Sequence, residues 1–232
     1  MADEDELDAQ VQRMDPDRWL ACRFIADAEA RADVIALYGL NLELSRAAEV
    51  ASQPLIGEMR LAWWREALEE MFEGRPVRRH PTAQALAQAV RRRGLSRDGL
   101  EALVDARLRD LEPWPLRPDE VERYLDSTAG ALMALAVRAL SPEADPHAVR
   151  HAARAWGLAG LSRLGRLPPD WPVRAQVLQA LRLAGDELKA LPVAAFPAVA
   201  YAALARPLAA GLAVSELGKR ARVTWAVLRG RV

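Results

Sequence analysis

Prolines, glycines and short polar links divide the largely apolar pattern of this chain into segments of helical length. Ala, Leu, Arg and Glu dominate these segments, and runs of β-branched or aromatic residues are absent, so helices are favoured nearly throughout. No repeat, low-complexity linker or change in composition marks a domain boundary. The pattern therefore predicts one all-α domain over residues 15–232. Residues 1–14 are acidic and lack an apolar run, and we expect them to be disordered.

Capping and helix-breaking residues place several helix ends. Asp15 followed by proline predicts the start of a first helix, with an acidic group at its N-terminus. Pro81 begins another helix, which Gly94 stops, and Ser96 caps the helix that follows, up to Leu111. Two helices joined at residues 52–54 are expected over residues 36–71, and others over residues 124–140, 147–165 and 173–191.

The most apolar stretch runs from Leu191 to Val214. Three prolines and Arg206 cut it into short pieces, so it lacks the uninterrupted apolar run of about 20 residues that a membrane-spanning helix needs. An apolar helix with few polar positions must be covered by another surface. We expect this stretch either to be buried in the bundle or to present a face that rests on a membrane.

Composition argues against several classes of function. Lys+Arg and Asp+Glu are equal, at 32 each, whereas a nucleic-acid-binding protein usually shows a basic excess. The single cysteine, Cys22, rules out an internal disulfide and a cysteine metal cluster. His147 and His151 have the i, i+4 spacing of metal ligands, but no third ligand is evident nearby. The N-terminus resembles neither a secretory signal nor an organelle transit peptide, so we expect a cytoplasmic protein.

A row of polar side chains lies on an otherwise apolar helix. Asn41, Ser45 and Glu49 follow one another at i, i+4 and i+8, so they share one helix face. The row has two interpretations. It is either part of a functional site, or a structural set in which Asn41 bonds within a helical core and Glu49 faces water.

Three segments resemble a known family. ALYGLNLELSR is followed by IGEMRLAWWREAL and then by YLDSTAGALMALA, and their order and spacing resemble those of the squalene/phytoene synthase family over residues 15–168. The resemblance implies the class I isoprenoid synthase fold, a single orthogonal bundle of helices. Enzymes of this family condense two prenyl diphosphates head to head and hold magnesium with two Asp-rich motifs. The segments resemble a divergent branch, the mitochondrial assembly factor of respiratory complex I, more closely than the true synthases.

This sequence departs from the family at both metal motifs. The two positions of the first motif, D-x-x-x-D, fall on Ser45 and Glu49, and only Glu49 offers the charged oxygen that Mg²⁺ prefers. The second motif should lie over residues 157–168, where there is no carboxylate and where Arg163 and Arg166 stand instead. These departures imply a protein without catalysis, or with binding alone. No cofactor is then expected, and Mg²⁺ on Glu49 is expected only in an active enzyme.

The resemblance also gives candidate pocket residues, which are Arg31, Asn41, Ser45, Glu49, Arg60, Trp64, Arg65, Tyr124, Thr128 and Gly130. Arg31 would meet a diphosphate, and its structural alternative is a solvated helix arginine. The arginines around Trp64 would line the mouth of a cavity, unless the ring simply packs. The segment that begins at Tyr124 would line a prenyl pocket, unless Gly130 only allows close helix packing. A separate charged set on one helix is expected to form an ion-paired surface, namely Asp105, Arg107 and Asp110.

Three functions fit these observations. In the first, the protein is a non-catalytic family member that binds a respiratory-chain assembly intermediate, as a peripheral protein of the inner membrane. In the second, it is an active prenyltransferase that uses Glu49 and substrate-bound Mg²⁺. In the third, its cavity only carries a lipid or an isoprenoid. The first predicts co-purification with respiratory-chain subunits, the second predicts magnesium-dependent turnover, and the third predicts a bound lipid without turnover.

Overall fold

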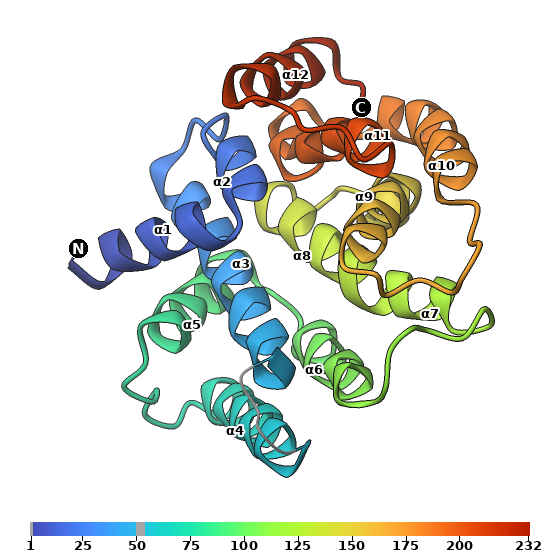
Figure 1. The fold of residues 1–232 in the computed structure, drawn as a ribbon. Coiled ribbons are helices and arrows are strands. Elements are labelled where there is room, and N and C mark those ends of the chain that lie inside the picture. Colours follow the sequence, from blue (N-terminus) through green and yellow to red (C-terminus); the bar gives the residue numbers. More distant parts are fainter. Residues whose placement is uncertain (1, 50–53) are drawn as a thin grey trace.

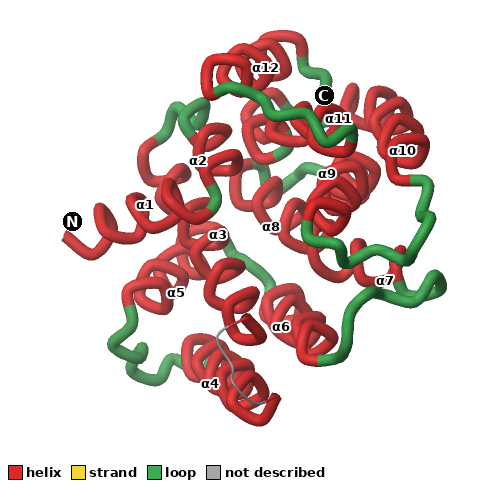
Figure 2. The backbone as a smooth tube through the Cα atoms, viewed as in Figure 1, coloured by secondary structure: helices red, strands yellow, loops and turns green. Residues whose placement is uncertain are grey.

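The computed structural model describes residues 2–49 and 54–232 (Figure 1). Over these two ranges the chain forms helices joined by loops, and no strand is present (Figure 2). The predicted all-α architecture is therefore confirmed. The helices cross one another at varied angles around a buried centre, and the N-terminal and C-terminal parts occupy different sides of the molecule (Figure 1).

Six α-helices form the first part of the chain, namely α1 (Ala2–Met14), α2 (Pro16–Cys22), α3 (Ala28–Glu49), α4 (Pro54–Phe72), α5 (Pro81–Arg93) and α6 (Arg97–Ala106). The second part contains α7 (Val121–Leu125), α8 (Ala131–Leu140), α9 (Arg150–Arg163), α10 (Val173–Glu187), α11 (Ala205–Ala209) and α12 (Glu216–Arg229). Short 3₁₀ segments lie between them, namely η1 (Arg107–Leu111), η3 (Pro146–Val149), η4 (Leu188–Ala190), η5 (Val193–Ala198) and η6 (Ala200–Leu204). One π-helical turn, η2 (Asp126–Gly130), joins α7 to α8.

Local capping chemistry sets the helix ends that the sequence predicts. The Asp15 carboxylate accepts a hydrogen bond from the backbone N–H of Arg18 at the start of α2. The Ser96 hydroxyl caps α6 in the same way, by accepting from the backbone N–H of Gly99 at 3.2 Å. Gly94 ends α5 in the left-handed region, with φ of 61°, where a residue with a side chain is strained. These three predicted ends are confirmed.

Helix α3 is the central element of the bundle. It packs against α1, α4, α5 and α8, and it runs through the middle of the molecule (Figure 1). Its apolar residues are buried on more than one side, as the consecutive residues Val34, Ile35, Ala36 and Leu37 show. A helix that is apolar nearly all round must be enclosed by others, and the sequence pattern of α3 therefore places it at the centre.

The helix predicted over residues 124–140 is continuous but not regular. A π-helical turn interrupts it at Asp126–Gly130, between α7 and α8. Within this segment the Thr128 hydroxyl donates a hydrogen bond to the carbonyl oxygen of Tyr124 at 2.6 Å. Such single π turns widen a helix locally and change the direction in which the side chains before and after it point.

The expectation of a disordered N-terminal segment is wrong for residues 2–14. They form α1, which packs against α3 and α5 and buries Leu7 and Val11 completely. The Gln10 amide also donates to the Glu43 carboxylate at 3.1 Å, which ties α1 to α3. Leu7 and Val11 are four residues apart and so form one apolar stripe, which the acidic character of the segment concealed.

The apolar stretch at 191–214 is folded into η5, η6 and α11. Its central residues, from Ala195 to Ala205, are almost entirely buried, apart from a half-buried Ala203. Of the two predicted placements, burial in the bundle is therefore confirmed for this part. No helix in the described ranges has the length and apolar character needed to cross a bilayer.

Candidate functional site

Four polar side chains from three elements meet inside the bundle. We call this group the inner polar network, and its members are Asn41 of α3, Arg107 and Asp110 of η1, and Tyr124 of α7. The Arg107 guanidinium donates to the Asn41 side-chain oxygen at 2.6 Å and to the Asp110 carboxylate at 3.1 Å. The Tyr124 hydroxyl donates to the other Asp110 oxygen at 2.6 Å. Each of the four side chains thus has a partner within the group.

The local fold explains why charged residues enter the interior here. The helix that follows Ser96 changes from α to 3₁₀ at Arg107, which rotates the next residues relative to an α-helical continuation. The change turns Arg107 and Asp110 toward α3 and α7. The prediction of an ion-paired surface is therefore wrong for Asp110, which is buried, although Arg107 and Asp110 do pair. Asp105 stays exposed on α6 and pairs with Arg65 of α4.

The surroundings of Tyr124 keep its phenol protonated. Burial raises the pKa of the Tyr124 phenol, the Arg107 charge opposes the rise, and the Asp110 carboxylate adds to it. The phenol therefore remains a neutral donor to the carboxylate over the physiological pH range. Asp110 and Arg107 neutralise one another inside the fold, as a buried ion pair must.

Aromatic and charged side chains close the network on the side of the proline-rich loop. The Trp114 ring meets the Tyr124 ring edge to face, with centroids 5.7 Å apart. The Arg109 and Arg166 guanidiniums lie 5.1 and 4.5 Å from the centre of the same Trp114 ring. Arg109 also donates to the Glu120 carboxylate at 3.1 Å. Arg166, which the sequence places in the segment expected to hold the second metal motif, therefore lies over an aromatic ring.

A second buried charge lies between α2, α3, α9 and η6. The Arg18 guanidinium is surrounded by the rings of Tyr38, Trp156 and Tyr201, at 5.7, 5.5 and 5.1 Å from their centres. It pairs with the Asp15 carboxylate at 2.6 Å. We call this group the Arg18 box. Cation–π contacts are strongest when desolvated, as they are here, because Arg18 is buried.

Opposing effects decide the charge of the Arg18 box. Burial by itself lowers the pKa of Arg18, but the Asp15 carboxylate and Tyr201 outweigh it, and the pKa is raised overall. Burial also raises the pKa of Tyr38 and of Tyr201. The box therefore holds one permanent cation among neutral phenols. No described residue forms a hydrogen bond of normal geometry with the hydroxyl of Tyr38 or of Tyr201, so this interior space is filled mainly by ring packing.

The sequence alone does not reveal the Arg18 box. Asp15 was interpreted only as a helix cap, and the aromatic residues that surround Arg18 come from positions far along the chain. One local signal existed. Asp15 and Arg18 are three residues apart, at a spacing that allows an ion pair in the first helical turn.

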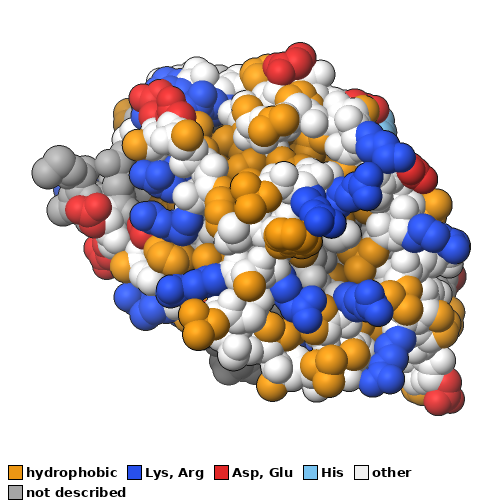
Figure 3. All heavy atoms as spheres, turned by 90° about the horizontal axis from the view of Figure 1, so that it is seen from above, with side chains coloured by type: hydrophobic (Ala, Val, Ile, Leu, Met, Phe, Trp, Pro, Cys, Tyr) orange, Lys and Arg blue, Asp and Glu red, His pale blue; other side chains and the backbone are white. Residues whose placement is uncertain are grey.

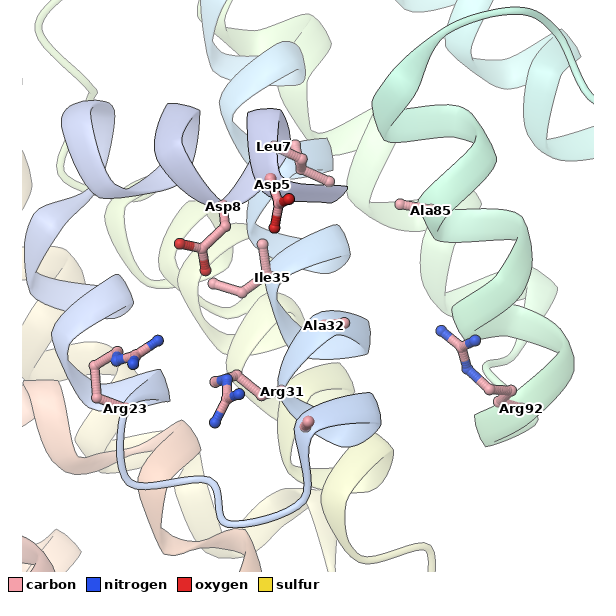
Figure 4. A pocket seen from close by; sticks show the side chains of 10 residues that line it. Asp5, Leu7, Asp8, Arg23, Arg31, Ala32, Ile35, Ala85 and Arg92 are labelled. Carbon is pink, nitrogen blue, oxygen red and sulfur yellow. The ribbon is translucent and has the colours of Figure 1, made fainter. Parts of the chain in front are cut away.

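Arg31 lies apart from both groups. Its guanidinium donates to the Ile25 carbonyl oxygen at 3.2 Å and lines a surface pocket of about 280 Å³ between α1, α3 and α5. Figure 4 shows Arg23 and Arg31 directed toward the same space, with Arg92 on α5 at the far side and the Asp8 carboxylate above them. The pocket therefore carries both signs of charge, and it does not join the inner polar network.

The polar row on α3 is divided by the structure. Asn41 faces the interior and accepts from Arg107. The Ser45 hydroxyl is half-buried and donates to the Leu42 carbonyl oxygen at 2.9 Å, within its own helix. Glu49 is the last residue of α3, and its side chain lies outside the described part of the structure.

The candidates on α4 do not meet the inner polar network. Trp64 is buried and packs edge to face against the rings of Trp63 and His80, at 5.0 and 5.2 Å, which is the packing role that was its structural alternative. Arg60 and Arg65 of the same helix are exposed, and Arg65 pairs with Asp105 of α6. Gly130, at the end of the π turn, lines a surface pocket of about 360 Å³, and an added Cβ there would lie 3.3 Å from the Leu125 carbonyl oxygen.

The histidine pair is also separated from any third ligand. His151 Nδ1 lies 2.6 Å from the Glu187 carboxylate, whereas His147 lines the Gly130 pocket. Among the side chains that the structure describes, no group of three or more His, Cys, Asp or Glu residues has the geometry of a metal site.

Comparisons with known proteins agree with this fold. The model of a family described as squalene/phytoene synthase matches residues 11–164. The chain is 33% identical over 141 residues to "NADH dehydrogenase (ubiquinone) complex I, assembly factor 6" of Rattus norvegicus and 32% identical over 141 residues to that of Homo sapiens; each match covers 59% of this chain and 42% of the relative. It therefore aligns with less than half the length of these relatives. A crystal structure of a dehydrosqualene synthase in complex with ligand superposes with a TM-score of 0.79, at 12% identity, over 98% of this chain and 96% of that chain.

Proposed function

The chain belongs to the squalene/phytoene synthase family, and we propose that it is a non-catalytic member of it that acts in the assembly of a respiratory-chain complex. The observation that carries the proposal is the inner polar network. Its four side chains hydrogen-bond one another, so the groups that make these bonds are not free to bind a substrate, although the buried Arg107 Nε has no partner among the described residues. The relatives named as complex I assembly factor 6 support the assembly role.

The residues at the two metal positions do not suit a cluster of magnesium ions. Mg²⁺ prefers carboxylates and phosphate oxygens in octahedral geometry. At the first motif, Ser45 carries no charge and donates a hydrogen bond within its own helix, which leaves Glu49 as the single carboxylate of the pair. At the second position, Arg166 brings a positive charge against Trp114. One carboxylate and one arginine do not form a site for several Mg²⁺ ions, and this supports a non-catalytic protein.

The partner in this proposal is an assembly intermediate of a respiratory-chain complex. Such an intermediate belongs to a membrane, so the protein would work in the cytoplasm at the inner face of the inner membrane and bind there peripherally. The assembly role and this location are inferred together, and they require physical association with respiratory subunits.

The test is a pull-down of the affinity-tagged chain from its own host, followed by mass spectrometry, together with native gels of membranes from a deletion strain. We expect respiratory subunits in the pull-down and a smaller subassembly in the deletion strain. In parallel, the purified protein is incubated with farnesyl and geranylgeranyl diphosphate, Mg²⁺ and NADPH, beside an active synthase. Squalene, phytoene or a presqualene-type product would overturn the non-catalytic proposal, and normal complexes in the deletion strain would overturn the assembly role.

A bound isoprenoid or lipid is the second candidate function. The pocket beside Gly130 favours it, because the small and apolar residues Ala131, Ala134 and Pro146 form part of its wall. A carrier would retain a prenyl lipid that organic extraction of the purified protein releases, without any turnover. An active prenyltransferase, the remaining alternative, would instead convert the diphosphates in the incubation above.

A further inference from the structure

Helix α12 has an apolar face on each side. Val223 and Ala226 are buried and attach it to the bundle, where it packs against η6 and α2. The opposite side carries Leu217, Ala221, Trp225 and Leu228, which we call the α12 stripe. These four residues recur at intervals of four, four and three, so they share one helix face.

The α12 stripe is open to solvent. Leu217 is 78% exposed, Leu228 is 74% exposed and Trp225 is 56% exposed. A surface helix normally directs its single apolar face inward and presents charged residues to water. A second apolar face that points outward lowers the solubility of the protein and does not stabilise its core. A continuous row of exposed apolar side chains therefore indicates an interaction surface.

Arginines surround this stripe. A groove of about 490 Å³ separates α12 from α10 and α11, with an apolar floor that includes Leu178 and Leu181. Its basic lining residues are Arg182, Arg206, Arg222, Arg229 and Arg231. None of the groove residues that the structure describes is acidic. The nearest acidic influence on these arginines is Asp186, whose pKa the Arg231 charge helps to lower.

The distribution of charge on this side of the molecule is visible directly. Figure 3 views the molecule from the side of α12 and shows Lys and Arg side chains dispersed among hydrophobic ones, with few acidic groups. The whole chain has as many acidic as basic residues, so the basic character of this face is a local arrangement. Residues 216–232 alone contain Lys219, Arg220, Arg222, Arg229 and Arg231 against a single Glu216.

We infer that the α12 stripe and its surrounding arginines bind the surface of an anionic lipid bilayer. Leucine and tryptophan side chains enter the boundary between headgroups and acyl chains, and tryptophan in particular favours that depth. Arginines beside them pair with lipid phosphates, while their aliphatic stems lie along the apolar surface. The Arg229 guanidinium lies 4.1 Å from the centre of the Trp225 ring. A cationic and an apolar group would therefore meet the membrane surface at the same depth.

The arrangement favours a lipid surface over a protein partner. The apolar side chains form a narrow row along one helix, and the charged side chains on either side of the row are mainly arginines. This is the composition of helices that lie in the plane of a membrane interface. The inference rests on the exposed face of α12 and does not depend on the proposed assembly function.

The experiment is co-sedimentation of the full chain with vesicles of phosphatidylcholine alone and of phosphatidylcholine with 30% phosphatidylglycerol, on the order of the anionic content that attracts basic segments. We expect binding to the anionic vesicles that weakens as salt is added, and little binding to the neutral ones. The variant Leu217→Ser/Leu228→Ser and the variant Arg222→Glu/Arg229→Glu should each lower the partition coefficient by about tenfold or more.

Matched controls lie on the far side of the molecule. Leu55 is 61% exposed near the start of α4, and Arg79 is exposed in the loop before α5. Leu55→Ser and Arg79→Glu remove comparable side chains without touching α12, and they should bind vesicles as the parent does. Thermal melts of all variants confirm that each one is folded. Equal binding of the α12 variants and the parent would overturn the inference, and so would an absence of binding to anionic vesicles.

Trp225 supplies an independent measurement. Insertion into a bilayer moves the emission of this exposed tryptophan to shorter wavelength, and Trp225→Phe should abolish most of the change while it retains binding. An unchanged blue shift in Trp225→Phe would overturn the placement of α12 at the lipid.

Size-exclusion chromatography without lipid tests whether a second copy of the chain binds the α12 stripe instead. A dimer that the leucine variant dissociates would assign the stripe to a second copy and overturn the lipid proposal. Vesicle binding requires no respiratory subunit, so its failure and a failure of the pull-down are distinguishable.

Discussion

The Tyr124 hydroxyl donates a 2.6 Å hydrogen bond to the Asp110 carboxylate, inside the bundle and between two elements that a proline-rich loop connects. This bond holds α7 against η1 and fixes the carboxylate that also receives Arg107. A carboxylate in this position is stabilised only while its donors remain, because water does not reach it. The hydrogen bond therefore gives the most direct test of the inner polar network.

Tyr124→Phe should lower the free energy of unfolding by about 1.5–3 kcal/mol, the value of a buried hydrogen bond to a charged group. The chain contains a matched control. Tyr38 is also buried, but its hydroxyl has no hydrogen-bond partner among the described residues, so Tyr38→Phe should leave the free energy of unfolding unchanged or raise it. Urea denaturation monitored by circular dichroism measures both values. Equal losses for the two variants would mean that the hydroxyl of Tyr124 contributes nothing specific.

The Arg18 box should respond unequally to the loss of its two charges. Asp15→Ala leaves a buried guanidinium without its counter-ion and removes the cap of α2, so we expect a loss of about 3–5 kcal/mol. Arg18→Met keeps apolar volume among three rings and should cost less. In the double variant Asp15→Ala/Arg18→Met, the loss should be smaller than the sum of the single losses. Additive losses in this double-mutant cycle would contradict the coupling of the pair.

Glu120 should make stability depend on acid pH. The backbone N–H of Arg117 and the Arg109 guanidinium both hydrogen-bond its carboxylate and lower its pKa in the folded protein below the ordinary value of 4.5. A carboxyl group whose pKa is lower in the folded than in the unfolded state binds fewer protons when folded. Its stabilising contribution is therefore complete above about pH 4.5 and is lost as the pH falls through the folded pKa.

Urea midpoints measured from pH 7 to pH 3 test this dependence. Glu120→Gln should be less stable than the parent at neutral pH, and the two curves should converge in acid as the parent's Glu120 becomes protonated. Glu58→Gln, at an exposed position of α4, is the matched control and should follow the parent throughout. A constant gap between Glu120→Gln and the parent down to pH 3 would show that the carboxylate charge has no part in the effect.

Cys22 should be unreactive in the native protein. It is buried at the end of α2, and burial raises the pKa of its thiol well above the ordinary value, with smaller contributions from Asp15 and Asp8. The thiolate is the reactive form, so both its low population and its lack of access to solvent suppress alkylation. We expect iodoacetamide to label Cys22 only in denaturant, as intact mass spectrometry can show. Rapid labelling at pH 8 without denaturant would mean that α2 opens locally.

The local sequence predicted the helices because helix ends depend on neighbouring residues. A carboxylate or hydroxyl one position before a helix, a proline in its first turn and a glycine in the left-handed region after it satisfy or terminate backbone hydrogen bonds within a few residues. This is why the ends at Asp15, Gly94 and Ser96 were predicted correctly. The exception is the change to a 3₁₀ helix at Arg107, where the contacts made by η1 with the rest of the fold decide the geometry.

The family was also available from the sequence, because it depends on motifs with a fixed order and spacing. The contacts of the individual candidate site residues could not be predicted from the sequence. Asn41 and Arg107 are separated by 66 positions in the chain and yet share a hydrogen bond. Nothing local distinguishes Asp110, which is buried, from Asp105, which is exposed, although both lie on one predicted helix.

By itself, then, the sequence determined the helical class, the helix ends at Asp15, Gly94 and Ser96, and the family of this protein, because each of these depends on local backbone chemistry or on linear spacing. The expected helix starts at residues 36 and 147 were wrong, since α3 begins at Ala28 and α9 at Arg150. Only the tertiary structure decided which charges are buried, that α1 is part of the bundle, and that α12 turns an apolar face outward. Burial of a charged or apolar side chain depends on which distant elements cover it. The contacts that bury such a side chain come from residues far apart in the chain, so a local sequence pattern cannot predict its burial.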